Sequence, residues 1–85
     1  PNIQYQLGVA YHRRGLLDQA ILNYRRAAEL MPNHVDAYIN LGDIYASRNE
    51  FASALAAYNT ALAIDPTNSY ASRKAKLAEE KLLEK

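Results

Sequence analysis

The sequence predicts an all-α fold in which antiparallel helix-turn-helix repeats stack as a short α-solenoid of five helices. One observation is an internal repeat, because the chain resembles itself when it is shifted by 34 residues. Another is that apolar residues recur at helical spacing between turn-forming residues. The chain is also small, with 85 residues, 49% of them hydrophobic, and no Cys, so dense apolar packing must stabilise it. We expect one domain, with repeat 1 in residues 1–34, repeat 2 in residues 35–68 and a C-terminal capping helix in residues 69–85.

The internal repeat extends through the whole unit. Identical residues occupy eight pairs of positions: Leu7 and Leu41, Gly8 and Gly42, Tyr11 and Tyr45, Arg14 and Arg48, Ala20 and Ala54, Tyr24 and Tyr58, Ala27 and Ala61, Pro32 and Pro66. The small residues among them lie on the predicted inward stripes. Because Gly inside a helix costs about 1 kcal/mol relative to Ala, its recurrence indicates close packing of two helices.

Repeat 1 is expected to contain two helices. In the first, Ile3, Leu7 and Ala10 recur at helical spacing as the core stripe, and Gly15 ends the helix. The second has a wide apolar stripe and stops before Pro32. That stripe comprises Leu17, Ala20, Ile21, Tyr24, Ala27 and Ala28. Since the connection between them is short, the two helices must lie antiparallel.

Repeat 2 and the last segment continue the pattern. The third helix breaks at Asn49 and the fourth stops before Pro66. Their stripes comprise Ala37, Tyr38, Leu41 and Tyr45, and then Phe51, Ala54, Leu55, Tyr58, Ala61 and Leu62. Asn68 is a predicted cap for a fifth helix, whose stripe comprises Ala71, Ala75, Ala78 and Leu82. Its other positions are mostly polar, so it should cap the solenoid, although exposed Leu77 and Leu83 leave continuation into further repeats open.

These residues at this spacing resemble the tetratricopeptide repeat, which has a Leu-Gly pair, a following Tyr, a second-helix Ala, an aromatic, another Ala and a closing Pro. The resemblance covers residues 1–68. It departs at Gln4, where repeat 2 has Tyr38, and at Leu16, where the family often has an acidic residue. The resemblance implies a right-handed α-solenoid that acts as a protein-interaction scaffold and is not an enzyme.

A candidate partner-binding surface follows from the first helix of each repeat, where one stripe is turned away from the paired helix. It comprises Asn2, Tyr5, Val9, His12 and Arg13 of repeat 1, Asp36, Ile39, Asn40 and Asp43 of repeat 2, and Tyr70, Arg73 and Lys74 of the last helix. The resemblance implies that such residues line a concave surface where peptides dock, and we call them the concave surface.

The chemistry of the concave surface suggests how it would recognise a ligand. Tyr5, Val9 and Ile39 are expected to form an apolar floor that anchors the partner. Asp36 and Asp43 would favour a basic group on the ligand. An acidic group would be favoured by Arg13, Arg73 and Lys74. Family members that clamp a chaperone's terminal carboxylate need Lys and Asn where Tyr5 and Val9 stand, so that specificity is not expected.

Other functions find no support in the residues. We expect no cofactor or metal, because His12 and His34 lack metal-ligand spacing and are expected to be solvated. Ser47 and Ser53 lack a nucleophile motif, and the glycines form no phosphate-binding loop. The distribution of charge argues against nucleic-acid binding, since the acidic repeat 2 lies between two mildly basic segments. The sequence has no apolar run near the roughly 20 residues that a membrane span needs.

We therefore expect a protein or peptide partner, and two alternatives stay open. The oppositely charged repeats could stack head to tail through the open edge of the first helix pair, which would make a homo-oligomer. The chain, which begins at Pro1, could also be engineered or excised from a longer array. The lack of Cys and of a signal peptide favours a cytoplasmic location.

Overall fold

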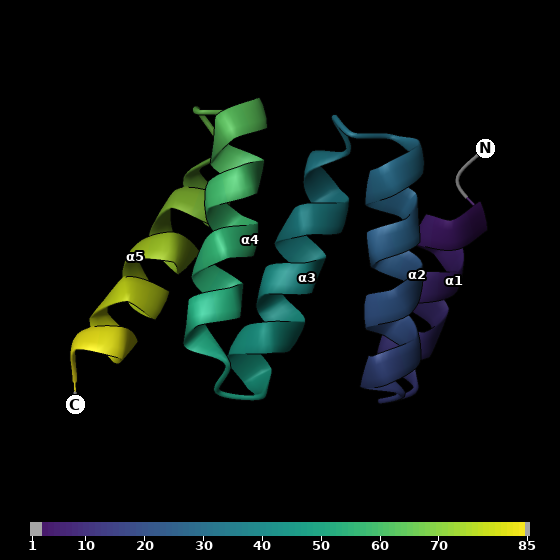
Figure 1. Cartoon of the computed structure of the whole chain (residues 1–85), viewed down its shortest axis with the longest axis horizontal. Coiled ribbons are helices and arrows are strands. Elements are labelled where there is room, and N and C mark those ends of the chain that lie inside the picture. The colour runs from purple at the N-terminus through teal and green to yellow at the C-terminus, as the bar shows by residue number, and fades with distance from the viewer. Residues whose placement is uncertain (1–2, 85) are drawn as a thin grey trace.

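The computed structural model describes residues 3–84 and contains five α-helices in that range (Figure 1). They are α1 (Ile3–Arg13), α2 (Leu17–Leu30), α3 (Val35–Ser47), α4 (Phe51–Ile64) and α5 (Ser69–Leu83). Successive helices run antiparallel, and each packs against the next along the chain. The predicted all-α array of five stacked helices is confirmed. None of the helices in this range has the length and apolar character needed to cross a bilayer.

Each helix pair is joined by a turn with one residue in the left-handed backbone region. Gly15 has a φ of 76° and Asn49, its equivalent in the second pair, has a φ of 61°. The next N–H at each turn donates to a tyrosine carbonyl five residues back, at 2.9 Å: Leu16 to Tyr11 and Glu50 to Tyr45. This is the Schellman pattern, which ends a helix where Gly or Asn can adopt positive φ. The predicted breaks at Gly15 and Asn49 are confirmed.

Side-chain caps begin the two helices that follow the prolines. The Oδ1 atom of Asn68 accepts a hydrogen bond of 2.9 Å from the N–H of Ala71, which confirms the predicted cap of α5. At α3 the cap is His34, whose Nδ1 accepts from the N–H of Ala37 at 3.2 Å. His34 is therefore not a freely solvated side chain, as the sequence suggested, because its partly buried ring hydrogen-bonds the first turn of α3.

A tyrosine ring packed on a glycine closes each helix pair. Tyr24 and Tyr58 are each 1% exposed. A Cβ atom on Gly8 would lie 2.7 Å from the Tyr24 ring, and one on Gly42 would lie 2.6 Å from the Tyr58 ring. Side-chain carbons do not approach so closely, so only glycine lets these rings reach the backbone of the neighbouring helix. The repeated glycine and tyrosine positions thus serve the same packing contact in both repeats.

Equivalent stripes on α1, α3 and α5 differ in burial. The stripe is buried on α3 (Ala37, Leu41, Ile44) and on α5 (Ala71, Ala75, Ala78). On α1, however, Ile3 and Leu7 are 62% and 41% exposed, and Ala10 is exposed as well. The prediction that this stripe of α1 lies in the core was wrong. Helix α2 packs on α3 and α4 packs on α5, whereas no helix of residues 3–84 covers this side of α1.

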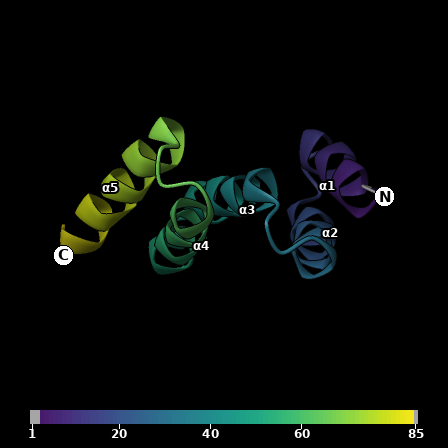
Figure 2. The same cartoon turned by 90° about the horizontal axis from the view of Figure 1, so that it is seen from above.

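The odd-numbered and even-numbered helices form different surfaces. Seen from above, α2 and α4 lie along one side of the array, α1 lies on the other and α3 lies between them, while α5 runs obliquely across the end of the array (Figure 2). The predicted concave surface is carried by α1, α3 and α5. We call the opposite surface, carried by α2 and α4, the convex surface.

Candidate partner-binding site

Tyr5 connects the two repeats at the concave surface. Its hydroxyl oxygen accepts a hydrogen bond of 2.9 Å from Nδ2 of Asn40, and its ring centroid lies 4.5 Å from that of His34. Burial and the nearby charge of Asp36 raise the pKa of Tyr5, whereas the hydrogen bond from Asn40 lowers it. Because the hydroxyl accepts from Asn40, its own proton can be donated to a bound partner.

Each repeat also brings the hydroxyl of its buried tyrosine to the concave surface. In repeat 1, the Tyr24 hydroxyl lies 3.4 Å from Nδ1 of His12, and the two rings are arranged edge to face. In repeat 2, the Tyr58 hydroxyl donates to Oδ1 of Asp43 at 2.5 Å. Tyrosines that pack the interior therefore also position polar side chains of the candidate site.

Asp43 receives a second tyrosine hydroxyl, because Tyr70 donates to its Oδ2 atom at 3.0 Å. Burial, followed by the hydrogen bond to Asp43 and its charge, raises the pKa of both Tyr58 and Tyr70. Both hydroxyls consequently remain protonated donors at neutral pH. The carboxylate joins α3 to α4 and α5, and it is less available to a basic ligand group than the sequence suggested.

The other predicted site residues differ in accessibility. The exposed ones are Arg13, Asp36, Tyr70 and Arg73, and the partly buried ones are Tyr5, Val9, His12, Asn40, Asp43 and Lys74. Asn2 lies outside the described residues. Tyr70, Arg73 and Lys74 meet in one small hollow on α5, where the Lys74 ammonium lies 5.5 Å from the centroid of the Tyr70 ring.

Ile39 does not belong to an exposed floor. It is only 9% exposed and forms a core cluster with Ala61 of α4 and Ala71 of α5. The expectation was wrong because the first turn of α5 packs near this part of α3. Spacing along a helix shows which residues share a face, but not how far the next helix extends over that face.

A groove of about 380 Å³ opens on the concave surface between α3 and α5, and we call it the α3–α5 groove. It is lined by Asp43, Ala46 and Ser47 of α3, Phe51 and Tyr58 of α4, and Lys74, Leu77, Ala78 and Lys81 of α5. Of these residues, only Asp43 and Lys74 belong to the concave surface predicted from the sequence. The spacing of Lys74, Leu77 and Lys81 along one face of α5 is the signal that could have identified the rest of that wall.

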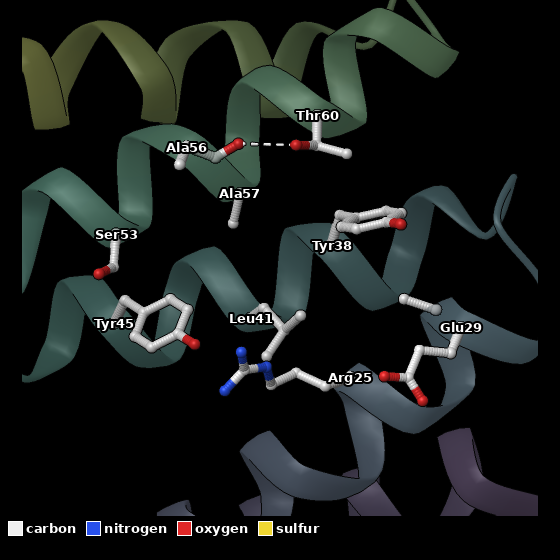
Figure 3. Close-up of a pocket in the computed structure, with 10 residues that line it drawn as sticks. Arg25, Glu29, Tyr38, Leu41, Tyr45, Ser53, Ala56, Ala57 and Thr60 are labelled. Carbon is white, nitrogen blue, oxygen red and sulfur yellow. Dashed lines mark hydrogen bonds between the residues drawn. The ribbon is translucent and has the colours of Figure 1, made fainter.

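A larger pocket of about 430 Å³ lies at the junction of α2, α3 and α4 (Figure 3). It is lined by Arg25, Ala28 and Glu29 of α2, Tyr38, Leu41 and Tyr45 of α3, and Ser53, Ala56, Ala57 and Thr60 of α4. This convex pocket was not predicted from the sequence, because Tyr38, Leu41 and Tyr45 lie on the predicted core stripe of α3.

The polar groups of the concave surface suit recognition of a polypeptide. They are tyrosine hydroxyls, an asparagine amide, and lysine and arginine cations, which hydrogen-bond or pair with backbone and side-chain groups. Within residues 3–84 no three His, Cys, Asp or Glu side chains converge closely enough to hold a metal ion.

Comparison with known proteins gives a consistent set of relatives. The family model described as tetratricopeptide repeat matches residues 1–67. A chloroplastic tetratricopeptide repeat domain-containing protein of Arabidopsis thaliana is 42% identical over 65 residues, which are 76% of this chain and 22% of that protein. Anaphase-promoting complex subunit 3 of Schizosaccharomyces pombe is 36% identical over 70 residues, covering 82% of this chain and 10% of the subunit. The peroxisomal targeting signal receptor of Komagataella phaffii is 32% identical over 65 residues, covering 75% of this chain and 11% of the receptor. The chain therefore spans no more than 22% of the length of these relatives.

Proposed function

This chain belongs to the tetratricopeptide repeat family, and on that premise we propose that it binds a protein or peptide partner through its concave surface. Two of its relatives are, by name, a subunit of a complex and a receptor for a targeting signal. Both names support protein interaction as the general role. The proposal assigns binding, and no reaction, to the residues of the concave surface.

The observation that carries the proposal is the combination of fixed and free side chains on this surface. Tyr5 and Asn40 hold each other in place across the two repeats, while Arg13 and Arg73 extend into solvent. Groups that are ordered before binding lose less conformational entropy when a partner docks. Tyrosine and arginine are also the residue types that most often contribute strongly to binding energy at interfaces.

Affinity capture with two matched charge reversals tests which surface binds. The first variant combines Arg13→Glu with Arg73→Glu on the concave surface, and the second combines Arg25→Glu with Arg26→Glu on the convex surface. All four side chains are exposed, so both variants should melt like the wild type when followed by circular dichroism. A partner lost only by the first variant supports the proposal, and a partner lost only by the second assigns binding to the convex pocket instead.

A second candidate function, self-assembly, is favoured by the exposed stripe of α1. Ile3 and Leu7 are open to solvent, whereas their equivalents on α3 are buried beneath α2. A second copy of the chain could cover this edge. Sedimentation equilibrium at rising concentration, in low and high salt, should then show association that Leu7→Glu abolishes. A constant monomeric mass for the wild type would eliminate this candidate.

A further inference from the structure

We propose that the α3–α5 groove binds an acidic amphipathic helix in which two acidic side chains lie seven residues apart and flank an apolar centre. This inference rests on the proposed function, since it specifies the partner of the concave surface. It is carried by the placement of charge and apolar surface along α5.

The wall formed by α5 carries a regular pattern. Lys74 and Lys81 are two helical turns apart on the same face, which places their backbones about 10 Å apart along the helix axis. Leu77 lies between them and is 48% exposed. The wall therefore offers a cation, an apolar side chain and a second cation in a line.

Both ammonium groups have capacity for another partner. The Lys81 Nζ lies 3.9 Å from a carboxylate oxygen of Glu84, whose side chain is 65% exposed, so that pair is long and solvated. Lys74 lies 5.5 Å from the Tyr70 ring centroid and makes no ion pair within residues 3–84. Each ammonium retains N–H donors for a carboxylate.

The remaining charge in the groove belongs to Asp43, on the opposite wall. Its two oxygens already accept hydrogen bonds from Tyr58 and Tyr70. A basic ligand group would have to compete with these hydroxyls, whereas an acidic group can approach the lysines of α5. Part of the lining is apolar, because Ala46 of α3, Phe51 of α4 and Ala78 of α5 contribute to it.

An α-helix presents residues i, i+3, i+4 and i+7 on one face, so acidic residues at i and i+7 can reach the two lysines. Apolar residues at i+3 and i+4 would then contact Leu77 and Phe51. The pattern reads the same from either end, so the bound helix can run in either direction along α5. An extended peptide spans the same distance in three residues, which puts the two side chains on opposite faces. The groove therefore favours a helix over a strand.

The test uses synthetic, fluorescein-labelled, Ala-rich peptides and fluorescence anisotropy with the whole chain. The acidic peptide carries Glu at i and i+7 and Leu at i+3 and i+4. One comparison peptide has Lys in place of both Glu, and another has the same composition with the second Glu moved to i+9, off the face. We expect the acidic peptide to bind, the off-face peptide to bind about fivefold more weakly and the basic peptide not to bind. Binding of the acidic peptide should weaken as salt rises above about 0.1 M.

Matched variants of α5 test the residues. The double variant Lys74→Glu, Lys81→Glu should lower the affinity for the acidic peptide at least about tenfold and should allow the basic peptide to bind. Lys76→Glu, an exposed reversal outside the groove, should change affinity by less than about twofold. Likewise, Leu77→Ala should weaken binding several-fold, while Leu83→Ala, at an 80% exposed position outside the groove, should not.

Several results would overturn the inference. Equal affinity for the acidic and off-face peptides would show that the groove does not recognise acidic residues at helical spacing. Tighter binding of a proline-containing extended acidic peptide would contradict the inference in the same way. If Lys76→Glu lowered the affinity as much as the Lys74→Glu, Lys81→Glu variant, binding would depend on the overall charge of α5 and not on the groove. If no peptide binds while the Arg13→Glu and Arg73→Glu variant still loses a captured partner, the acidic-helix inference fails and the proposed function stands.

Discussion

Replacing Gly42 with Ala sets two effects of opposite sign against each other. Within a helix Ala is about 1 kcal/mol more favourable than Gly, so helix propensity alone predicts a more stable protein. In this fold, however, the added Cβ would lie 2.6 Å from Cε1 and 2.8 Å from Cδ1 of Tyr58. The ring or the helix would have to move.

The surroundings of Tyr58 determine how much Gly42→Ala changes the free energy of unfolding. The side chain is 1% exposed, and its hydroxyl is bonded to Asp43, so the ring cannot swing aside without losing that contact. Overpacking a well-filled core costs about 1–3 kcal/mol, and a hydrogen bond to a charged group contributes about 1.5–3 kcal/mol. With both costs, and after the gain of about 1 kcal/mol in helix propensity, Gly42→Ala should lower the free energy of unfolding by about 1.5–5 kcal/mol. Each kcal/mol corresponds to a fall in Tm of about 4–8 °C for a domain of this size.

Urea unfolding and thermal melting followed by circular dichroism measure this change. Ser72→Ala, at an exposed position inside α5, is the control for propensity alone and should be neutral or stabilising by a few tenths of a kcal/mol. In a Tyr58→Leu background the ring is gone, so adding Gly42→Ala should no longer destabilise. A Gly42→Ala protein that melts above the wild type would refute the claim that the Tyr58 ring requires glycine.

Three further predictions concern the caps, the stripes and pH. Asn68→Ala should lower the free energy of unfolding in urea by about 1 kcal/mol, because α5 loses its cap, and no change would show that the cap is dispensable. Leu41→Ala and Ile39→Ala, both buried, should each cost about 2–5 kcal/mol. Leu7→Ala, at the position equivalent to Leu41, should cost less than about 1 kcal/mol, since its side chain is exposed, and equal losses would contradict the burial pattern. Burial raises the pKa of Tyr24 from 10.0 to about 12; the unfolded chain therefore ionises first, and the stability present below pH 10 is lost as the pH rises towards about 12. Tyr24→Phe should flatten the fall of Tm over that range, and an unchanged slope would assign the effect to other groups.

Helix positions and helix ends could be predicted from the sequence because local chemistry determines them. Gly15 and Asn49 can adopt positive φ, and Asn68 can accept from the N–H three residues on. The repeat pattern likewise identified Gly8 and Gly42 as sites of close helix packing. Each of these inferences depends on residues near one another in the chain or on their exact recurrence.

Burial of a helix face was harder to predict, because it depends on what lies beyond the face. The stripe of α1 has the same period as that of α3, yet Ile3 is exposed where Ala37 is buried. Ile39 lies on the face predicted to be open, yet it is buried in a cluster with Ala61 of α4 and Ala71 of α5. Periodicity is a property of one helix, whereas coverage is set by a neighbour distant in sequence.

The polar contacts of the candidate site were also beyond sequence reasoning. The carboxylate of Asp43 meets Tyr58 and Tyr70 only because three helices are rotated in a particular way. The hydrogen bond between Tyr5 and Asn40 depends on the fit between the two repeats in the same manner. The sequence could place these residues on a surface, but not pair them.

The buried residues of α5 are all alanines, and two of them, Ala75 and Ala78, stand at the positions where α3 buries Leu41 and Ile44. Alanine removes less apolar area from water than leucine or isoleucine, so these positions of α5 contribute less burial than their equivalents on α3. In a linear array a helix is held only by its neighbours, which lets α5 detach while the others stay folded. Its amide hydrogens should therefore exchange with solvent sooner than those of α2 and α3. Since α5 carries Lys74 and Lys81, the α3–α5 groove exists only in the docked fraction of molecules, and that fraction scales the apparent affinity of any ligand that binds there.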